Sequence, residues 1–362
     1  LVRDMVGMSF EGETFEDQFL ICDIRTTLPG WEFERRFYFD PEWNPGRQVL
    51  IHPCPDSTYR IDWQVPPAYD VEAEEKSGAL DARIRRIVGD ADYEIVWKSV
   101  YRFHARQVDQ MVAGRLLMAG DGAHLVAPFG ARGLNSGVPD AENAAWKVAF
   151  AMKGWSDPAL VQTYHDERHA AAAENLAVTA ETMRFLVPQS EQEWAQRHEI
   201  LEAAATDPAA RAKVNSGRMA EPFWYVDSPL TTPSATHVFP GRPPKGEDPV
   251  PAPGVIAPDV EVLLPSGESA RIRTLARHGL LVLVGADLSV AAVTDALAGL
   301  RCPTTVLALA EVDPDGSVTA ALGAAPGEAW IIRPDAHIAA VATSVAEAAE
   351  AAYRAIGAPL PA

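Results

Sequence analysis

The chain has 362 residues, and its 50 acidic and 31 basic side chains give a formal net charge of −19. This acidity disfavours nucleic acids and anionic membrane surfaces as partners, because both require a basic face. The 48% hydrophobic content excludes a wholly disordered chain. No apolar run approaches the ~20 residues of a membrane-spanning helix, and the acidic start is not a signal peptide. Three isolated cysteines, Cys22, Cys54 and Cys302, form no disulfide or zinc pattern and predict a reducing, cytoplasmic compartment.

The first hundred residues predict a largely antiparallel sheet. The β-rich runs FLICDIRTTL, RRFYFD, VLIHP and TYRIDWQV are separated by Pro, Gly and Asp turns without an intervening helix. A helical pattern follows over Asp70–Asp92, with acids at its start and arginines at its end, and then a strand over Tyr93–Gln107. Four aromatic residues could line a substrate cavity or pack in the sheet core, and the sequence does not separate these alternatives. They are Trp31, Trp43, Tyr59 and Trp63.

The segment Gly114–Ala149 carries the chemistry. GRLLMAGD predicts a buried strand that ends on the carboxylate of Asp121, and a glycine-rich loop, APFGARGLNSG, leads into a helix through Gly154. Gly130, Gly133 and Gly137 would let the backbone approach a flat ligand closely. Asn135 or Ser136 would cap the helix, and Pro139 would be tolerated near the first turn. Apolar residues recur at helical spacing along this helix: Val138, Ala141, Ala145, Val148, Ala149 and Met152.

The rest of the chain predicts helices, a linker and a compact β/α unit. Residues 158–205 are rich in helix formers, and residues 229–258 are rich in Pro and Gly. A β-α-β-β-α order follows, with a hairpin that turns at Arg333–Ala336. This order resembles the thioredoxin-like fold, but Cys302 stands alone before Pro303, which favours a structural domain over a disulfide exchanger.

The combined pattern G-R-x-x-x-x-G-D-x-A-H-x-x-x-P-F-G-A-R-G-x-N-S-G-x-x-D-A-x-N-A-A-W-K resembles the second FAD motif of the flavoprotein aromatic hydroxylases. The nearest types are the 3-(3-hydroxyphenyl)propionate hydroxylase-like and phenol hydroxylase-like monooxygenases. The resemblance extends to ERRFYFDP in the substrate domain, to LVQTYHDERHA and to the hairpin AWIIRPDAHIAA. It therefore covers essentially the whole chain.

The resemblance implies a monooxygenase that hydroxylates a phenolic or polycyclic aromatic substrate with FAD, NADH or NADPH, and O2. The flavin would carry the chemistry, while the protein binds, orients and excludes water. Asp121 would bind the ribityl chain, and Arg115 would be near the cofactor or structural. The isoalloxazine would be lined by Pro128, Phe129, Gly130, Gly133, Leu134 and Asn135. No catalytic side chain is identified, no metal is expected, and a homodimer is possible by analogy.

Several features depart from the family pattern. Gly122 and Ala336 replace the usual Ala and Gly, Pro139 is uncommon, and Ala336 would cost little in a type I turn. The G-x-G-x-x-G turn that binds the pyrophosphate is absent. The segment GDGAHL matches the first two glycines of this pattern but lacks the third. With no initiator Met before Leu1, the chain looks like a family member cut inside its FAD domain. We therefore expect weak or no FAD binding by the chain alone, and an FAD-side core that lacks strands and exposes apolar surface.

The expected fold is a multidomain α/β and α+β architecture. It comprises a substrate-binding β-sheet domain with the start of the FAD domain (1–107), the C-terminal part of the FAD-binding domain with its helices (108–228), a linker (229–258) and a thioredoxin-like domain (259–362). Two other functions compete with the hydroxylase. One is a non-catalytic remnant or binding module, and the other is a Baeyer–Villiger or quinone-forming flavin oxygenase.

Three smaller patterns favour ordinary structural roles. His165 and His169 stand at i and i+4, but no Glu directly follows the first His as in a zincin, so a solvated helix face is favoured. His124 is favoured as a packed residue over a general base. Asp313–Gly316 lacks the closing Glu of a calcium loop and predicts a turn.

Overall fold

The computed structural model describes residues 1–215, 217–244 and 246–360, which form two compact units. The first comprises residues 1–109, 121–135 and 172–220, and the second comprises residues 110–120, 136–171 and 221–362. The chain passes between the units within two helices, α4 (Arg132–Met152) and α5 (Thr163–Leu186). The four-part division made from the sequence stays a prediction.

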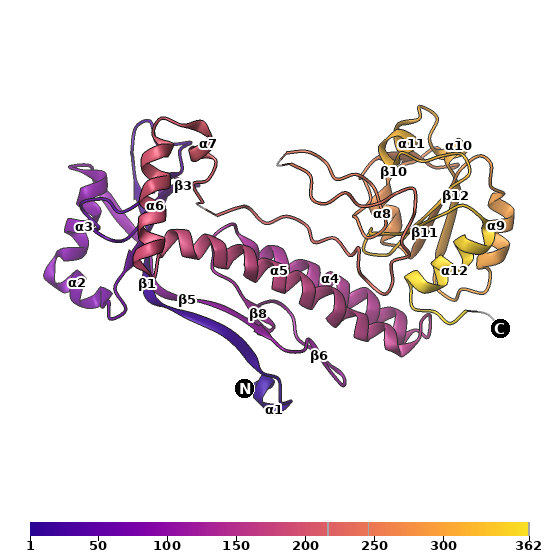
Figure 1. Ribbon diagram of the computed structural model, residues 1–362, viewed down its shortest axis with the longest axis horizontal. Coiled ribbons are helices and arrows are strands. Elements are labelled where there is room, and N and C mark those ends of the chain that lie inside the picture. The colour runs from indigo at the N-terminus through magenta and orange to yellow at the C-terminus, as the bar shows by residue number, and fades with distance from the viewer. Residues whose placement is uncertain (216, 245, 361–362) are drawn as a thin grey trace. The chain divides into compact units, whose positions relative to one another are not determined.

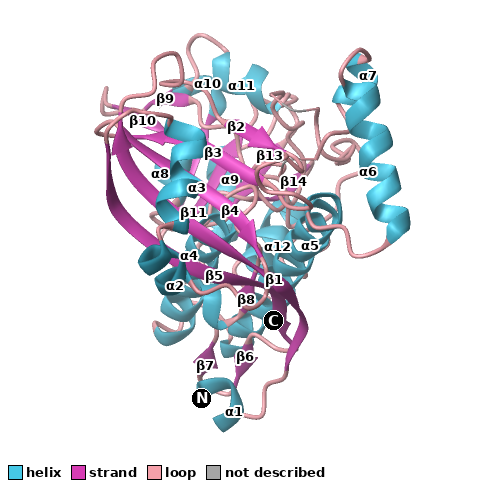
Figure 2. Cartoon of the chain, turned by 90° about the vertical axis from the view of Figure 1, so that its left-hand side faces the viewer, coloured by secondary structure: helices cyan, strands magenta, loops and turns pink. Residues whose placement is uncertain are grey.

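The first unit contains a six-stranded antiparallel sheet with the order β2-β3-β4-β1-β5-β8 (Figures 1 and 2). Its strands lie where the sequence predicts them, except that β1 begins nine residues before the predicted run FLICDIRTTL and that the short β8 is not predicted. They are β1 (Phe10–Thr26), β2 (Arg36–Tyr38), β3 (Val49–Cys54), β4 (Thr58–Val65), β5 (Tyr93–Val108) and β8 (His124–Leu125). A short helix, α1 (Val2–Met5), precedes them. The antiparallel prediction is confirmed.

Two helices cover one face of this sheet. The predicted helix over Asp70–Asp92 is divided into α2 (Val71–Ser77) and α3 (Ala79–Val88) by Gly78, whose φ of +80° ends the first helix. Trp63 and Tyr59 are 0% and 4% exposed in the core between α3 and the sheet, and Trp31 and Trp43 pack against the same core. Core packing is therefore the observed role of Tyr59 and Trp63, while Trp31 and Trp43 are partly buried against the same core.

A second apolar group, the phenylalanine cluster, contains residues of β1, β2, β5 and the end of α5. Its buried members include Phe19, Phe129, Met183 and Leu186, and its partly buried members are Phe15, Phe37, Phe39, Phe103 and Phe185. Two further helices follow α5 in the chain, α6 (Glu191–Ala204) and α7 (Pro208–Arg211). The cluster brings residues far apart in sequence next to Phe129 of the glycine-rich motif.

The segment before that motif is not the buried strand predicted over Gly114–Asp121. The chain instead forms a small hairpin of β6 (Val112–Ala113) and β7 (Leu116–Leu117), followed by the 3-10 helix η1 (Gly120–Gly122). Gly114 has a φ of +59° and turns the hairpin, so Leu116 pairs back onto Ala113. Because β7 pairs locally with β6, the apolar run does not extend into a long strand.

The second unit contains a four-stranded sheet with the order β12-β11-β13-β14, in which β11 and β12 are parallel and the other pairs antiparallel. Apolar clusters lie on both of its faces, so every residue of β11 is buried. Its elements follow the predicted β-α-β-β-α order: β11 (Leu280–Val284), α9 (Val290–Leu297), β12 (Thr304–Ala308), β13 (Ala329–Ile332), β14 (Ile338–Ala342) and α12 (Val345–Ala355). Shorter elements surround them: η2 (Pro158–Gln162), β9 (Glu261–Leu263), β10 (Ser269–Arg271), α8 (Ile272–Ala276), α10 (Leu309–Val312) and α11 (Ser317–Leu322).

The hairpin between β13 and β14 turns at the predicted place, but Ala336 is strained there. Its φ of +61° lies in the left-handed region, which disfavours a residue with a Cβ atom. Substitution of the family's Gly by Ala336 therefore carries a conformational cost.

The described part of 229–258 contains no helix or strand, yet it packs onto β14. The amide of Thr232 donates to the carbonyl of Ala339 at 2.8 Å, and the amide of Gly254 donates to the carbonyl of Ile338 at 2.7 Å. Leu230 and Val255 are buried. Across the described residues, we find no helix with the length and apolarity needed to cross a membrane.

Candidate functional site

The residues predicted to contact a flavin lie in one short segment of the first unit, 121–135. Asp121 is the middle residue of η1 and is exposed, so it lies in a 3-10 turn and not at the end of a buried strand. Pro128, Leu134 and Asn135 are also exposed, whereas Phe129 and Gly130 are buried. The segment therefore presents a carboxylate and a helix start on its surface.

Gly130 is required by the protein's own backbone. Its φ is +85°, and a Cβ atom there would lie 2.0 Å from the carbonyl oxygen of Arg218. Ala131 follows with a φ of +55°, so the chain turns sharply before α4. Gly137, in contrast, lies in α4, where its Cβ atom would meet the Cα atom of Gly120 at an ordinary 3.5 Å. Close approach to a ligand is therefore not what demands glycine at either position.

Arg132 stabilises this turn through hydrogen bonds of its side chain. Its guanidinium is buried and donates to Asn175 Oδ1 at 2.5 Å and to the carbonyls of Arg218 and Met219 at 3.1 and 3.2 Å. The amide of Ala220 donates to the carbonyl of Gly130 at 2.8 Å. Sequence reasoning did not single out Arg132, because an arginine in a glycine-rich loop gives no sign of burial.

The helix α4 starts earlier than the sequence predicts. Since it begins at Arg132, Asn135 and Ser136 lie within its first turns and do not cap it; Asn135 Nδ2 donates to the carbonyl of Ala131 at 2.7 Å. Pro139 lies inside the helix and not near its first turn. At Gly133 a Cβ atom would meet no atom within 4 Å, so the first turn of α4 borders open space.

The ring of Phe129 belongs to the phenylalanine cluster. Its centroid lies 6.0 Å from that of Phe19 and 5.8 Å from that of Phe103, with edge-on geometry in both pairs. Phe19 and Phe103 stack at 4.2 Å. The motif is thereby joined to an aromatic environment on the sheet.

In the second unit, charged residues are buried beneath α4. Asp140 Oδ2 accepts the amide of Gly120 at 2.9 Å, and its Oδ1 accepts Nε of Arg168 at 2.7 Å. Arg168 also donates to the hydroxyl of Tyr225 at 3.1 Å. Asp140 and Arg168 thus fix the residue that directly precedes Asp121.

Glu167 of α5 lies at the centre of these charges (Figure 1 shows α4 and α5 side by side). It accepts hydrogen bonds from Lys147 Nζ at 2.6 Å, Asn143 Nδ2 at 2.7 Å and Arg333 Nη2 at 2.9 Å. Burial alone would raise the pKa of Glu167, but Arg333 and Lys147 hold it well below its usual range. Burial lowers the pKa of Lys147 to about 8, against the opposing effect of Glu167.

Arg333 also binds Asp335 of the β13–β14 turn at 2.6 Å, and Trp146 Nε1 donates to Asp335 at 3.1 Å. We call the buried charged residues the ionic cluster: Asp140, Lys147, Glu167, Arg168, Arg333 and Asp335. Its cations and carboxylates are equal in number. These residues lie within the sequence motifs, which give them no individual role. The signal available in the sequence was polar residues at helical spacing along a predominantly apolar helix.

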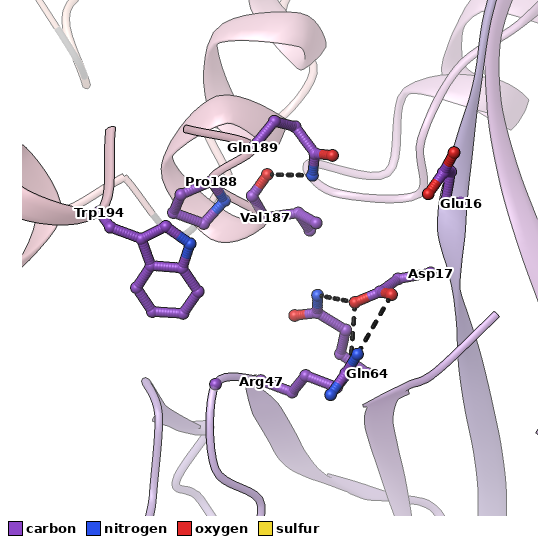
Figure 3. A pocket seen from close by; sticks show the side chains of 9 residues that line it. Glu16, Asp17, Arg47, Gln64, Val187, Pro188, Gln189 and Trp194 are labelled. Atoms are coloured by element: carbon purple, nitrogen blue, oxygen red, sulfur yellow. Dashed lines mark hydrogen bonds and ion pairs between the residues drawn. The ribbon is translucent and has the colours of Figure 1, made fainter. Parts of the chain in front are cut away.

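The first unit also contains a cavity of about 320 Å³ that the predicted flavin-contact residues do not line. Asp17, Arg47 and Gln64 lie on one side, and Pro188 and Trp194 on the other (Figure 3). Asp17 accepts hydrogen bonds from Gln64 Nε2 at 2.7 Å and from Arg47 Nε at 3.1 Å, so these polar groups already satisfy one another.

The other residues considered from the sequence are three that were expected to have structural roles and Arg115. His165 Nδ1 accepts the amide of Met111 at 3.2 Å, and the described residues contain no group of three side chains that could hold a metal. His124 is buried in β8. Asp313 accepts the amides of Val318 and Thr319 at 2.9 and 2.8 Å, which makes the predicted turn a helix start. Arg115 is exposed.

Comparison with known families gives a match to the FAD binding domain over residues 1–179. Among curated proteins, a 3-(3-hydroxy-phenyl)propionate/3-hydroxycinnamic acid hydroxylase of Comamonas testosteroni is 30% identical over 191 residues, which is 52% of this chain and 32% of that protein. A dialkyldecalin synthase of Streptomyces rugosporus is 34% identical over 184 residues, or 49% of this chain and 39% of that protein. The matched region spans about a third of the length of these relatives.

Solved structures share the fold over nearly the whole chain. The flavin-dependent monooxygenase PieE, in complex with FAD and substrate, is 22% identical with a TM-score of 0.77, and the match covers 99% of this chain and 68% of that one. An aklavinone-11 hydroxylase with FAD and aklavinone is 22% identical with a TM-score of 0.69, covering 98% of this chain and 65% of that one.

Proposed function

Because the chain belongs to the family of FAD-dependent aromatic hydroxylases, we propose that it serves the hydroxylation of an aromatic substrate, phenolic or polycyclic, with NADH or NADPH and O2. One observation carries the proposal. The segment 121–135 presents Asp121 and the open first turn of α4, and its Phe129 contacts the phenylalanine cluster.

The residues of this segment fit an isoalloxazine with a ribityl chain. Asp121 is exposed, so its carboxylate can accept hydrogen bonds from ribityl hydroxyls. Open space at Gly133 leaves room for a flat ring against the first turn of α4, with Pro128, Leu134 and Asn135 exposed around it. The backbone at Phe129 and Gly130 would complete this contact, and the Phe129 ring would remain in the phenylalanine cluster.

A bound flavin would supply the redox chemistry, since it can be reduced by the nicotinamide and can activate O2. The chain's own part is electrostatic and steric. Amide groups in the first turn of a helix favour negative charge, so the start of α4 would stabilise a reduced, anionic flavin. The phenylalanine cluster would hold an aromatic substrate and exclude water.

We further propose a thioredoxin-like fold for residues 259–362. The strand order β12-β11-β13-β14, with one parallel pair, supports this assignment. Cys302 is buried, and burial raises the pKa of its thiol, which favours a structural domain over a redox one. The free cysteines of the chain accord with the proposed reducing, cytoplasmic location.

A flavin titration tests the site. We expect weak binding of FAD and of FMN to this chain, because it contains no G-x-G-x-x-G turn for the pyrophosphate. Gly133→Leu should abolish that binding without loss of thermal stability, since no protein atom lies within 4 Å of the added Cβ atom. Ala173→Leu, at an exposed position of α5, is the matched control.

Two outcomes would count against these expectations. A stoichiometric yellow complex would refute the expected weak binding, and equal flavin affinity of Gly133→Leu and wild type would refute the site. NADH and NADPH oxidation, followed with phenols and polycyclic phenols and with mass spectrometry for an added oxygen atom, tests the reaction. Nicotinamide oxidation that yields hydrogen peroxide with every aromatic compound would argue against hydroxylation.

A further inference from the structure

The six-stranded sheet has one face that packs against α3 and a second face, here called the outer face, that carries polar residues. Side chains alternate between the two faces along a strand. Ile61 and Trp63 of β4 belong to the core against α3, so Asp62 between them lies on the outer face. His52 follows the core residue Ile51 on β3 and lies on the outer face for the same reason.

Asp62 and His52 each have a buried atom without a hydrogen-bond partner. The neighbouring Arg60 is satisfied, because its Nε and Nη2 donate to the two carboxylate oxygens of Asp23, both at 2.7 Å. Asp62 Oδ1 and His52 Nδ1, in contrast, are buried and have no partner within the part of the chain that the structure describes. A buried polar atom without a partner is unfavourable for the fold. A ligand that supplies the partner would therefore be bound at this place.

The two residues lie close to each other and to the phenylalanine cluster. Asp62 pairs with Leu50 in the β3–β4 ladder, so His52, two residues along β3, is its diagonal neighbour at about 7 Å. Gln64, about 7 Å along β4 in the opposite direction, pairs with Phe19 of the cluster. Gln64 also lines the cavity shown in Figure 3, so the outer face is hollowed next to Asp62. A two-ring aromatic ligand on the cluster would consequently place a substituent at Asp62.

The charges at this place suit a hydroxyl group as the substituent. Burial raises the pKa of Asp62 to about 7, an effect that Arg60 and Arg35 oppose and Asp23 assists. Burial, Arg35 and Arg60 lower the pKa of His52, so its ring is neutral at pH 7. Above pH 7 the Asp62 carboxylate can only accept hydrogen bonds, and it binds a hydroxyl donor through a charge-assisted bond.

We propose that Asp62 and His52 determine specificity for an aromatic substrate with a hydroxyl group, whose ring lies on the phenylalanine cluster and whose hydroxyl donates to Asp62. The identity of the ligand as a substrate rests on the proposed function, whereas its binding requires no flavin. A ring without a hydroxyl would leave the buried polar atoms unpaired, which is an effective basis for rejecting an analogue. Asp62 is also unfavourable for the fold by itself, as is typical of residues kept for function.

Equilibrium dialysis of the chain without flavin tests the proposal. The probes are 2-naphthol and its methyl ether, 2-methoxynaphthalene, which keeps both rings but has no hydroxyl donor. At pH 8 the wild-type chain should bind 2-naphthol at least about tenfold more tightly than the ether, because the hydroxyl donates to a charged acceptor. At pH 6 this preference should nearly disappear, since the protonated Asp62 can donate to the ether oxygen.

Three variants locate the effect. Asp62→Asn should show, at both pH values, the small preference that the wild type shows at pH 6. His52→Phe keeps a ring but no ring nitrogen, and it should lower the preference severalfold while retaining the dependence on pH. Glu94→Gln is the matched control: Glu94 lies on β5, is 68% exposed and pairs with Arg25 at 2.6 Å, so its loss should leave the preference unchanged.

Several results would overturn the proposal. They are a wild-type chain that binds neither probe or binds both equally at pH 8, a tenfold preference that persists in Asp62→Asn or is unchanged in His52→Phe, and a wild-type preference that is the same at pH 6 and pH 8. Asp62-dependent binding of 2-naphthol without formation of any oxygenated product would uphold the site and count against hydroxylation. Addition of oxygen to both probes with equal efficiency would uphold the proposed function and overturn the specificity.

Discussion

Glu167 is the position where one neutral substitution should destabilise the second unit most. Its carboxylate accepts hydrogen bonds from Lys147, Asn143 and Arg333, and its side chain is 1% exposed. Glu167→Gln keeps the shape but leaves two buried cations with one anion fewer. Breaking a buried ion pair from one side typically costs about 3–5 kcal/mol. With a urea m-value of about 2 kcal/mol/M, the unfolding midpoint should fall by about 2 M.

The assay is urea unfolding at pH 7, with Glu350→Gln as control. Glu350 pairs with Arg354 at 3.2 Å on the surface, where the two side chains are 60% and 45% exposed, so its loss should cost less than about 0.5 kcal/mol. Equal midpoints for the two variants would refute the reasoning.

The pH dependence gives a second check on Glu167. Because its pKa is lowered in the folded state, its contribution is present above the unfolded pKa and is lost as the pH falls through the folded value. The part of the deficit that comes from the Glu167 carboxylate should therefore hold down to about pH 4.3 and shrink below it. Because Glu167 raises the pKa of Lys147, which is about 8 in the wild type, Glu167→Gln should lower that pKa. Lys147 of the variant then loses its uncompensated charge at a lower pH than in the wild type, so the deficit should shrink as the pH rises towards 8 and stay level above it.

Three further predictions concern single residues. Burial raises the pKa of Asp62 to about 7, so between pH 4 and 7 the folded state holds a proton that the unfolded state has lost, and stability falls as the pH rises. Asp62→Asn should remove this fall and gain about 1–2 kcal/mol at pH 8 after solvent screening. Equal slopes of unfolding free energy against pH for the variant and the wild type would contradict this. Ala336→Gly should raise the melting temperature by relieving the φ of +61°, a gain of about 0.5–1 kcal/mol, whereas Ala291→Gly within α9 should lower it. Gly130→Ala should destabilise the first unit by more than about 2 kcal/mol, because its Cβ atom would lie 2.0 Å from a carbonyl oxygen. Gly133→Ala should instead stabilise α4 by up to about 1 kcal/mol. A higher melting temperature for Gly130→Ala than for Gly133→Ala would contradict the geometry.

The sequence by itself determined the elements whose signals are local. Period-two runs between Pro, Gly and Asp turns predicted β1 to β5 of the antiparallel sheet, and the β-α-β-β-α order predicted the four-stranded sheet with its hairpin turn. A long motif with fixed spacing identified the family. These features can be read without a structure, because each depends on neighbours within a few residues of one another.

The tertiary structure decided what pairs with what and what is buried. The apolar run GRLLMAGD did not form a long strand, because Leu116 pairs with Ala113 across Gly114. Gly130 proved necessary for the approach of Arg218, a contact across 88 residues that no local pattern encodes.

The helix α4 gives the clearest example of this division. Its periodicity was readable, and the apolar side was the natural choice for its buried face. The structure buries Asp140, Asn143 and Lys147 and exposes Val138 and Met152. The buried side also holds Trp146 and Phe150, which pack in an apolar cluster, so it is mixed in character. The reason is that buried charges are stable only where partners of opposite charge reach them, and those partners, Glu167, Arg168 and Arg333, come from distant parts of the chain. Spacing within one helix specifies its two faces, but only the elements packed against it decide which face is buried.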